Sequence, residues 1–167
     1  MSTRGCVAVG IPLKWEGIYN HYDSYPGGLG LDLWHILLHE KDLKDFAARL
    51  LRCDSWPAFL AAEIGPEDNY DGRLDCAHIT NEDADPLFIE WVYIIDPERN
   101  MLHVLKHESV GNRLDFSKRS IGPVKLTGRV VDYGHCAFKH VLVASLKLDG
   151  PEPDWGRLGH ENKLEED

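Results

Sequence analysis

The richest group of side chains able to do chemistry lies within the first 30 residues. The segment Thr3–Gly5 carries one arginine, and the segment Tyr19–Gly30 adds a histidine, an aspartate and tyrosines in the run YNHYDSYPGGLG. Arginine binds anions, and histidine exchanges protons near neutral pH. Glycines that lead into a helix let backbone N–H groups approach a negative charge. These residue types together predict a site for an anionic ligand or substrate.

Each member of this predicted site can be given a role. Arg4 would bind the anion, His21 would act as general base or acid, and Asp23 would orient His21. The remaining members would contact the ligand: Tyr19, Asn20, Tyr25, Gly28 and Gly30. The alternative is structural, because Asn, Asp, Ser, Pro and Gly are also the residues that a tight turn requires.

The two segments meet only if the strands that carry them pair in a suitable register. A hairpin turn centred on residues 13–14 places Cys6 opposite His21 and Arg4 opposite Asp23, where the last two would form an ion pair. A cysteine beside a histidine can also be held as a thiolate nucleophile, which makes Cys6 an alternative catalyst. Both pairings depend on this register, because a slip of one residue turns every side chain of a strand to the other face of the sheet.

Further residues have spacings that suit a metal ion. Asp32, His35 and His39 share one face of a predicted helix, and two histidines at i and i+4 are a common zinc pair. The alternative is a solvated helix face, since HILLHE is not H-E-x-x-H. The pairs 76/78 and 135/136 supply two cysteines and two histidines, and the acidic loop from residue 67 begins like a calcium loop but lacks its final glutamate. No cofactor motif is present, so the cofactor stays open.

The N-terminal motifs resemble those of small uncharacterised proteins of bacteria and their phages. Those proteins open with a TRG strand and carry a run like YNHxDSYPxGLG further along, which Thr3–Gly5 and Tyr19–Gly30 match here. The run EWVYIID at Glu90–Asp96 is similar to their aromatic strand followed by a tight turn. The resemblance implies a common architecture and a shared site, with no established reaction.

Hydrophobic periodicity predicts the elements that position these residues. Alternating apolar patterns predict strands over residues 5–11, 16–21, 87–95, 101–106, 125–133 and 140–148. Helical spacing predicts helices over residues 29–39, 43–51 and 56–63, the last with Ser55 as its N-cap and Pro57 in its first turn. Strands and helices follow one another in separate runs, so we expect an α+β fold: a mostly antiparallel sheet of two or more hairpins with two to three helices packed on it.

Charge is distributed unevenly along the chain. The 167 residues include 28 acidic and 18 basic ones, for a net charge of −10. Residues 149–167 contain seven acidic and two basic residues, and therefore contribute −5 of that total. Because this stretch is also rich in Pro and Gly, we expect a single domain over residues 1–148 followed by an acidic, mobile tail.

Acidity and the absence of a known catalytic motif favour a binding or interaction module. Its partner would be a basic protein, as for a regulator or inhibitor in a bacterial or phage context. The alternative is a small hydrolase or transferase that acts on an anionic substrate such as a nucleotide through Arg4, His21 and Asp23. The sequence has neither a membrane-length apolar run nor a signal peptide, which favours a cytoplasmic location without membrane association. Direct nucleic-acid binding is not expected, since it needs clustered Lys and Arg.

Overall fold

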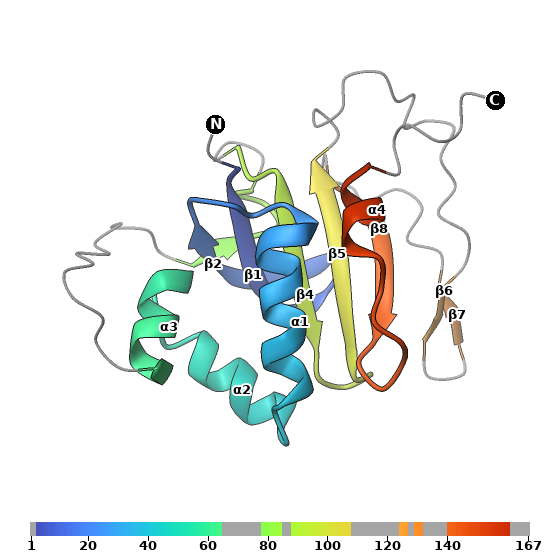
Figure 1. Cartoon of the computed structure of the whole chain (residues 1–167), viewed down its shortest axis with the longest axis horizontal. Helices are drawn as coiled ribbons and strands as arrows, with labels where there is room; N and C mark the ends of the chain where they lie inside the picture. Colours follow the sequence, from blue (N-terminus) through green and yellow to red (C-terminus); the bar gives the residue numbers. More distant parts are fainter. Residues whose placement is uncertain are drawn as a thin grey trace.

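The computed structural model describes residues 3–64, 78–84, 88–107, 124–126, 129–131 and 140–160 (Figure 1). Its main element is a six-stranded sheet with the strand order β3-β2-β1-β4-β5-β8. These strands are β1 (Gly5–Ile11), β2 (Lys14–Asn20), β3 (Ile79–Thr80), β4 (Trp91–Asp96), β5 (Met101–His107) and β8 (His140–Lys147). A separate two-stranded hairpin consists of β6 (Val124–Leu126) and β7 (Arg129–Val131).

The sheet is mostly antiparallel, as the sequence predicts. The hairpins β1–β2 and β4–β5 are both antiparallel, and so are the pairs β2–β3 and β5–β8. Only the contact between β1 and β4 is parallel, and it joins the two hairpins into one sheet. The α+β class is therefore confirmed, with α1 (Leu31–Leu38), α2 (Leu43–Leu50), α3 (Trp56–Ile64) and α4 (Trp155–His160) as its helices.

The predicted helix starts are marked by side-chain caps. Asp42 caps α2, where its carboxylate accepts hydrogen bonds from the backbone N–H of Lys44 at 3.0 Å and of Asp45 at 3.1 Å. Ser55 caps α3 as expected, because its hydroxyl accepts from the Ala58 N–H at 3.2 Å. Each cap satisfies a backbone donor that the first helical turn leaves without a partner.

One face of the sheet packs against helices. Figure 1 shows α1 and α4 on the same side of the sheet. Val7, Tyr93 and Val104 on that face are fully buried in one apolar cluster with residues of α1 and α4. The helices also meet each other, since the rings of Trp34 and Trp155 lie edge to face with centroids 6.0 Å apart. This cluster is the larger part of the core.

The end of the described chain belongs to this core, which differs from the tail expected after residue 148. Trp155 is 5% exposed and Leu158 is 9% exposed, and both lie in the cluster on the helix-bearing face. Asp154 starts α4, because its carboxylate accepts from the Arg157 N–H at 3.0 Å. The Pro- and Gly-rich composition conceals this short amphipathic turn, whose two apolar residues lie three positions apart. Residues 161–167 of the predicted tail lie outside the described residues.

The opposite face of the sheet carries a second apolar cluster. Its members on β1, β4, β5 and β8 are Cys6, Ala8, Val92, Ile94, Met101, Leu105 and Leu142. Trp15 and Ile89 also belong to it. Successive residues of a strand alternate between faces, so this cluster marks which side chains point away from α1 and α4.

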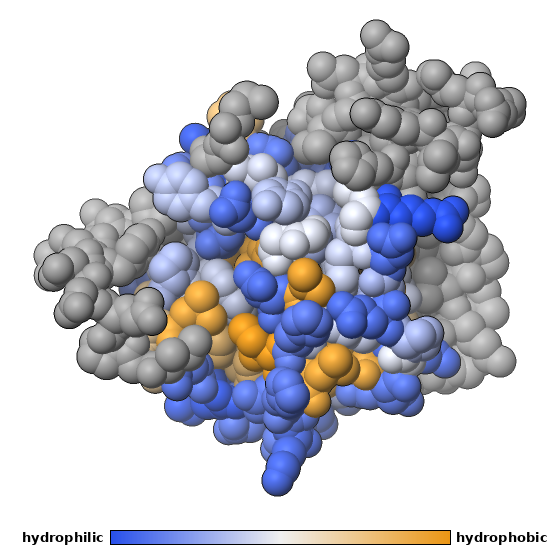
Figure 2. Space-filling model, viewed as in Figure 1, coloured by the Kyte–Doolittle hydropathy of each residue, from blue (hydrophilic) through white to orange (hydrophobic). Residues whose placement is uncertain are grey.

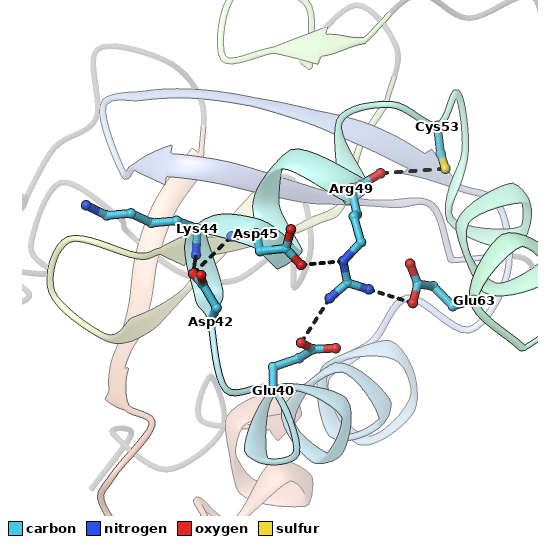
Figure 3. A network of polar contacts seen from close by, with 7 residues as sticks. All are labelled: Glu40, Asp42, Lys44, Asp45, Arg49, Cys53 and Glu63. Carbon is cyan, nitrogen blue, oxygen red and sulfur yellow. Dashed lines mark hydrogen bonds and ion pairs between the residues drawn. The ribbon is translucent and has the colours of Figure 1, made fainter.

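An ion-pair network around Arg49 connects α2 and α3 to the residues that directly follow α1. Figure 3 shows Arg49 surrounded by Glu40, Asp45 and Glu63. Its guanidinium donates to all three carboxylates over distances of 2.6–2.9 Å. Hydrogen bonding to Glu63, and then to Glu40, raises the pKa of Arg49. The network therefore engages three of the acidic side chains within the fold, where they hold α2 and α3 to the end of α1.

The surface on the helix-bearing side is largely hydrophilic. Figure 2 shows apolar side chains there only in small patches among polar ones. Over the part of the chain that the structure describes, no helix has both the length and the apolar character needed to cross a membrane.

Candidate functional site

The turn that follows β2 brings the two predicted segments together. The Ser24 N–H donates to the Thr3 carbonyl at 3.3 Å, so the TRG strand and the YNHYDSYP run are in direct contact. Asn20 is buried and donates to the Tyr22 carbonyl at 2.6 Å and to the Ser24 hydroxyl at 2.9 Å. The Tyr93 hydroxyl then donates to the Ser24 carbonyl at 2.6 Å. These bonds fix the turn against the centre of the sheet.

The glycines after this turn are required by close approaches. Asp23 has a positive φ of 51°, and its carbonyl accepts from the Leu29 N–H at 2.9 Å. A Cβ on Gly28 would lie 2.3 Å from the same carbonyl oxygen. A Cβ on Gly30 would lie 2.8 Å from ring atoms of Tyr93 and of Trp155. Asn20, Gly28 and Gly30 thus have structural roles in the turn, and ligand contacts by these residues stay a prediction.

The register expected for the first hairpin is wrong by two residues. Gly5 pairs with Asn20 and Cys6 pairs with Tyr19, so Cys6 is not opposite His21. The turn consists of Pro12 and Leu13, one residue earlier than predicted, because proline favours the first central position of a turn. Extending the observed register by one residue places His21, and not Asp23, beside Arg4. The expected ion pair between Arg4 and Asp23 is absent.

His21 is oriented by a tyrosine. The Tyr19 hydroxyl and His21 Nδ1 are 2.6 Å apart, and the Tyr22 ring contacts the imidazole edge to face at 4.4 Å between centroids. No hydrogen bond joins Asp23 to His21, so the orienting role predicted for Asp23 belongs to Tyr19. With Nδ1 engaged, the Nε2 of His21 makes no hydrogen bond to any residue that the structure describes. That nitrogen is the one left to exchange a proton with a ligand.

The sheet continues this site across further strands. Arg4 is beside Glu90, because Gly5 pairs with Trp91 and the Glu90 N–H donates to the Arg4 carbonyl at 3.0 Å. The His107 N–H donates to the Glu90 carbonyl at 2.8 Å, and His107 pairs with His140. In sheet order the side chains run His21, Arg4, Glu90, His107 and His140. We call these five residues the end row.

The end row lies on one face of the sheet. Cys6, Val92, Leu105 and Leu142 are each two residues along a strand from one of its members, and all four belong to the cluster on the face away from α1. Tyr19, two residues before His21, packs against the same cluster. Because strand side chains alternate, the end row projects from that face as well. At about 4.8 Å between strands, it spans about 19 Å.

The end row combines one guanidinium and three imidazoles in a protein that is acidic as a whole. Its single carboxylate is that of Glu90, in a chain whose net charge is −10. In the described ranges, no carboxylate forms an ion pair with Arg4. His140 is 2% exposed, its Nε2 lies 2.7 Å from the Ile89 carbonyl, and its ring contacts that of His107 at 5.0 Å between centroids. The guanidinium of Arg4 is therefore the member of the row that is placed to bind an anion.

The other predicted candidates are placed elsewhere. Asp32 and His35 lie on α1 and His39 ends it, all exposed, and His35 Nε2 contacts a Glu152 carboxylate oxygen at 3.2 Å. Cys76, His135 and Cys136 lie outside the described residues, as does the start of the acidic loop. His78 contacts Glu16 at 2.7 Å. Among the side chains that the structure describes, no three His, Cys, Asp or Glu residues are grouped to hold a metal ion.

Cys6 is not placed as a nucleophile. It is fully buried in the core, and that burial raises the pKa of its thiol far above the usual range. A catalytic cysteine needs the thiolate and access to substrate. Cys6 has neither.

The sequence analysis found the first two members of the end row and missed the other three. Glu90, His107 and His140 each stand at the end of an apolar strand, and a charged or polar residue in that position was the available signal. Their assembly depends on the strand order, which no local pattern encodes. Comparisons with protein families, with curated proteins and with solved structures find no match for this chain. The resemblance to bacterial and phage proteins therefore stays a prediction.

Proposed function

We propose that this protein is a small cytoplasmic hydrolase or transferase that binds an anionic, phosphate-bearing substrate, such as a nucleotide, along the end row. The observation that carries this proposal is the alignment of Arg4, His21 and His107 with Glu90 and His140 on one face and at one end of the sheet. Arg4 forms no ion pair with a described carboxylate, although the chain carries a net charge of −10.

Arg4 is the primary anion contact in this proposal. A guanidinium presents a planar fork of donors that matches two oxygens of a phosphate. Glu90 is next to Arg4 on the neighbouring strand, and the two form no ion pair, so the guanidinium is available to a ligand. The backbone carbonyl of Arg4 is held by the Glu90 and Trp91 N–H groups at 3.0 and 3.4 Å, which fixes the start of the side chain.

His21 supplies the proton transfer. Its Nδ1 is engaged by the Tyr19 hydroxyl at 2.6 Å, which fixes the ring plane, and this hydroxyl can donate to Nδ1 or accept from it. The Nε2 can then take a proton from an attacking water or hydroxyl group, or give one to a leaving oxygen. Tyr22, whose ring contacts His21, is 62% exposed, and Tyr25 in the same turn is 46% exposed. Both offer ring faces for a nucleobase or other planar group.

The proposal is tested by the thermal stability of the full chain with inorganic phosphate, pyrophosphate and a set of nucleotides. A ligand at 100 times its dissociation constant adds about 2.7 kcal/mol, which raises the Tm of a chain this size by roughly 5–10 °C. The Arg4→Gln variant should fold normally and lose this shift. Arg52→Gln is the matched control, because Arg52 is an exposed arginine away from the end row.

Hydrolysis or transfer is then followed with the anion that stabilises the protein. His21→Gln should retain the stabilisation by ligand and lose turnover by about 100-fold or more, the usual contribution of a positioned acid or base. If no anion raises the Tm, or if Arg4→Gln and Arg52→Gln respond alike, the end row does not bind anions and the proposal is wrong.

An interaction module is the second candidate, and exposed aromatic side chains favour it. Tyr22 and Phe88 are 62% and 70% exposed, and both lie near the end of the sheet that carries the end row. Phe88 also has a positive φ of 56°, which is uncommon for a bulky residue. Exposed aromatic residues are enriched in protein interfaces. A photocrosslinking residue at position 88 should then capture one defined basic protein in cells, whereas the same residue at position 52 should not.

A further inference from the structure

A second polar cluster lies on the same face of the sheet, at the opposite end from the end row. Ser145 Oγ is 2.7 Å from His103 Nδ1, and His103 Nε2 is 3.1 Å from an Asp96 carboxylate oxygen. Arg99 donates to the same carboxylate oxygen at 3.3 Å. The connectivity is hydroxyl to imidazole to carboxylate, as in a serine nucleophile with its base and orienting acid. The two ring nitrogens are exchanged relative to the usual triad, because Nδ1 faces the hydroxyl and Nε2 faces the carboxylate.

The three residues converge through the strand register. His103 pairs with Ile94 on β4 and with Ser145 on β8, and Asp96 is two residues beyond Ile94 on the same face. The pairing of β5 with β8 shifts register between Val104 and Leu105, close to Ser145. Such bulges redirect side chains and recur beside active sites. Among the described strands β8 pairs only with β5, so Ser145 lies on an edge strand.

The three side chains differ in their exposure to solvent in the way that a serine nucleophile with a buried base and acid requires. Asp96 is 1% exposed and His103 is fully buried, whereas Ser145 is partly exposed. The acid and the base are therefore shielded from water, and the hydroxyl is the member that a substrate can reach. A buried carboxylate and imidazole act more strongly on each other than the same groups would in water.

The partners of His103 decide its tautomer. Burial alone would raise the pKa of Asp96, but the hydrogen bond and charge of His103, together with Arg99, outweigh it and lower that pKa. An ionised carboxylate can only accept hydrogen bonds, so Nε2 of His103 carries the proton that faces Asp96. When His103 is neutral, the proton on Nε2 leaves a lone pair on Nδ1, to which the Ser145 hydroxyl can donate. In that form His103 can act as a general base toward Ser145.

We propose that Ser145 is the nucleophile of an esterase site that takes activated carboxylic esters or thioesters, with His103 as general base and Asp96 as the residue that positions it. The site is separate from the end row, since three residues of β5 lie between His103 and His107, which are about 13 Å apart along the strand. Neither site requires the other.

The reaction balances without any oxidant or reductant. The Ser145 proton moves to His103 Nδ1 while Oγ forms a bond to the acyl carbon, and the carbonyl electron pair moves to its oxygen. Collapse of this intermediate breaks the bond to the leaving alcohol or thiol, which takes the proton from His103. Water then attacks the acyl-serine ester, gives a proton to His103, and the bond to Oγ breaks as Oγ recovers that proton. The products are a carboxylic acid and an alcohol or thiol.

The test uses the full chain with p-nitrophenyl acetate and with a fluorophosphonate, followed by intact-mass and peptide mass spectrometry. The fluorophosphonate forms a phosphorus–oxygen bond to a nucleophilic serine and releases fluoride and a proton. We expect one adduct on Ser145 and a burst of p-nitrophenol, both lost in Ser145→Ala. Ser55→Ala is the control for reduced stability, because it removes a helix cap and leaves the cluster intact. Arg52→Gln, at an exposed arginine outside both sites, should react like the wild type.

Positioning by Asp96 has its own readout. In Asp96→Asn the amide can donate to Nε2, which favours the tautomer with the proton on Nδ1 and removes the base. Loss of such a carboxylate lowers turnover by about 10⁴-fold in a serine protease, so we expect the burst rate to fall by at least about 100-fold and its pH profile to change. If neither reagent modifies Ser145, or if Ser145→Ala retains the adduct and the burst, the cluster is structural and the proposal is wrong.

Discussion

At the scale of single residues, the protonation state of Asp96 links the polar cluster to stability. His103 and Arg99 outweigh burial and lower the pKa of Asp96 from its usual value of 3.8. A carboxylate with a depressed folded-state pKa stabilises the fold above its unfolded pKa. That contribution is lost as the pH falls through the folded pKa. The pH range to watch is therefore the acidic one, from about pH 4 downwards.

We expect Asp96→Asn to lower the free energy of unfolding by about 1–3 kcal/mol at pH 7, since a hydrogen bond to a buried charge is lost. The difference from wild type should stay constant above about pH 5 and shrink as the pH falls below 3.8. Urea denaturation at a series of pH values measures it. Glu98→Gln is the control in the same turn, because Glu98 is 72% exposed. A difference that grows towards low pH would contradict the assignment.

Cys6 is the second prediction at this scale. Its burial and raised pKa should prevent alkylation in the native state. A variant that retains Cys6 and carries serine at positions 53, 76 and 136 should react with a maleimide only after denaturant is added, as intact-mass spectrometry will show. Rapid reaction of the native variant would mean that this part of the core is open to solvent.

At the scale of elements, the approach of the turn after β2 to α4 depends on Gly30. A methyl group there would lie 2.8 Å from ring atoms of Tyr93 and Trp155, both buried. We expect Gly30→Ala to cost about 1–3 kcal/mol of unfolding free energy, the range for overpacking a core. At Gly27 a methyl group would meet only Tyr25, at 3.8 Å. Gly27→Ala should therefore change stability by no more than about 0.5 kcal/mol. Equal losses in the two variants would show that helix geometry, and not this contact, selects the glycine.

At the scale of the whole molecule, the last described helix closes the core. Trp155 is 5% exposed and contacts Trp34 edge to face, far away in the sequence. We expect Trp155→Ala to cost about 3–5 kcal/mol, the usual loss for a large buried aromatic side chain. Gly156→Ala is the neighbouring control, because Gly156 is exposed and its added methyl group would make only an ordinary contact at 3.5 Å. Guanidinium denaturation of both variants decides whether residues 151–160 belong to the folding unit.

The sequence alone determines the features that depend on neighbours in the chain. The strand Gly5–Ile11, the helix Leu43–Leu50 and the Ser55 cap follow from local periodicity and from local hydrogen bonds. The α+β class follows from the order of those elements. The turn of the first hairpin is also a local feature, yet it lies one residue earlier than predicted. Because the turn sets which residues of the two strands are opposite each other, this shift changed every pair in the hairpin.

Only the tertiary structure decided which side chains meet. The parallel pairing of β1 with β4 places Arg4 beside Glu90, and the pairing of β5 with β8 brings Ser145 to His103. These contacts join residues more than 40 positions apart, and their free energy comes from burying both faces of the sheet together. Local patterns carry no information about such partners. The end row, the serine cluster and the packing of α4 therefore become visible only when the strands are placed in order.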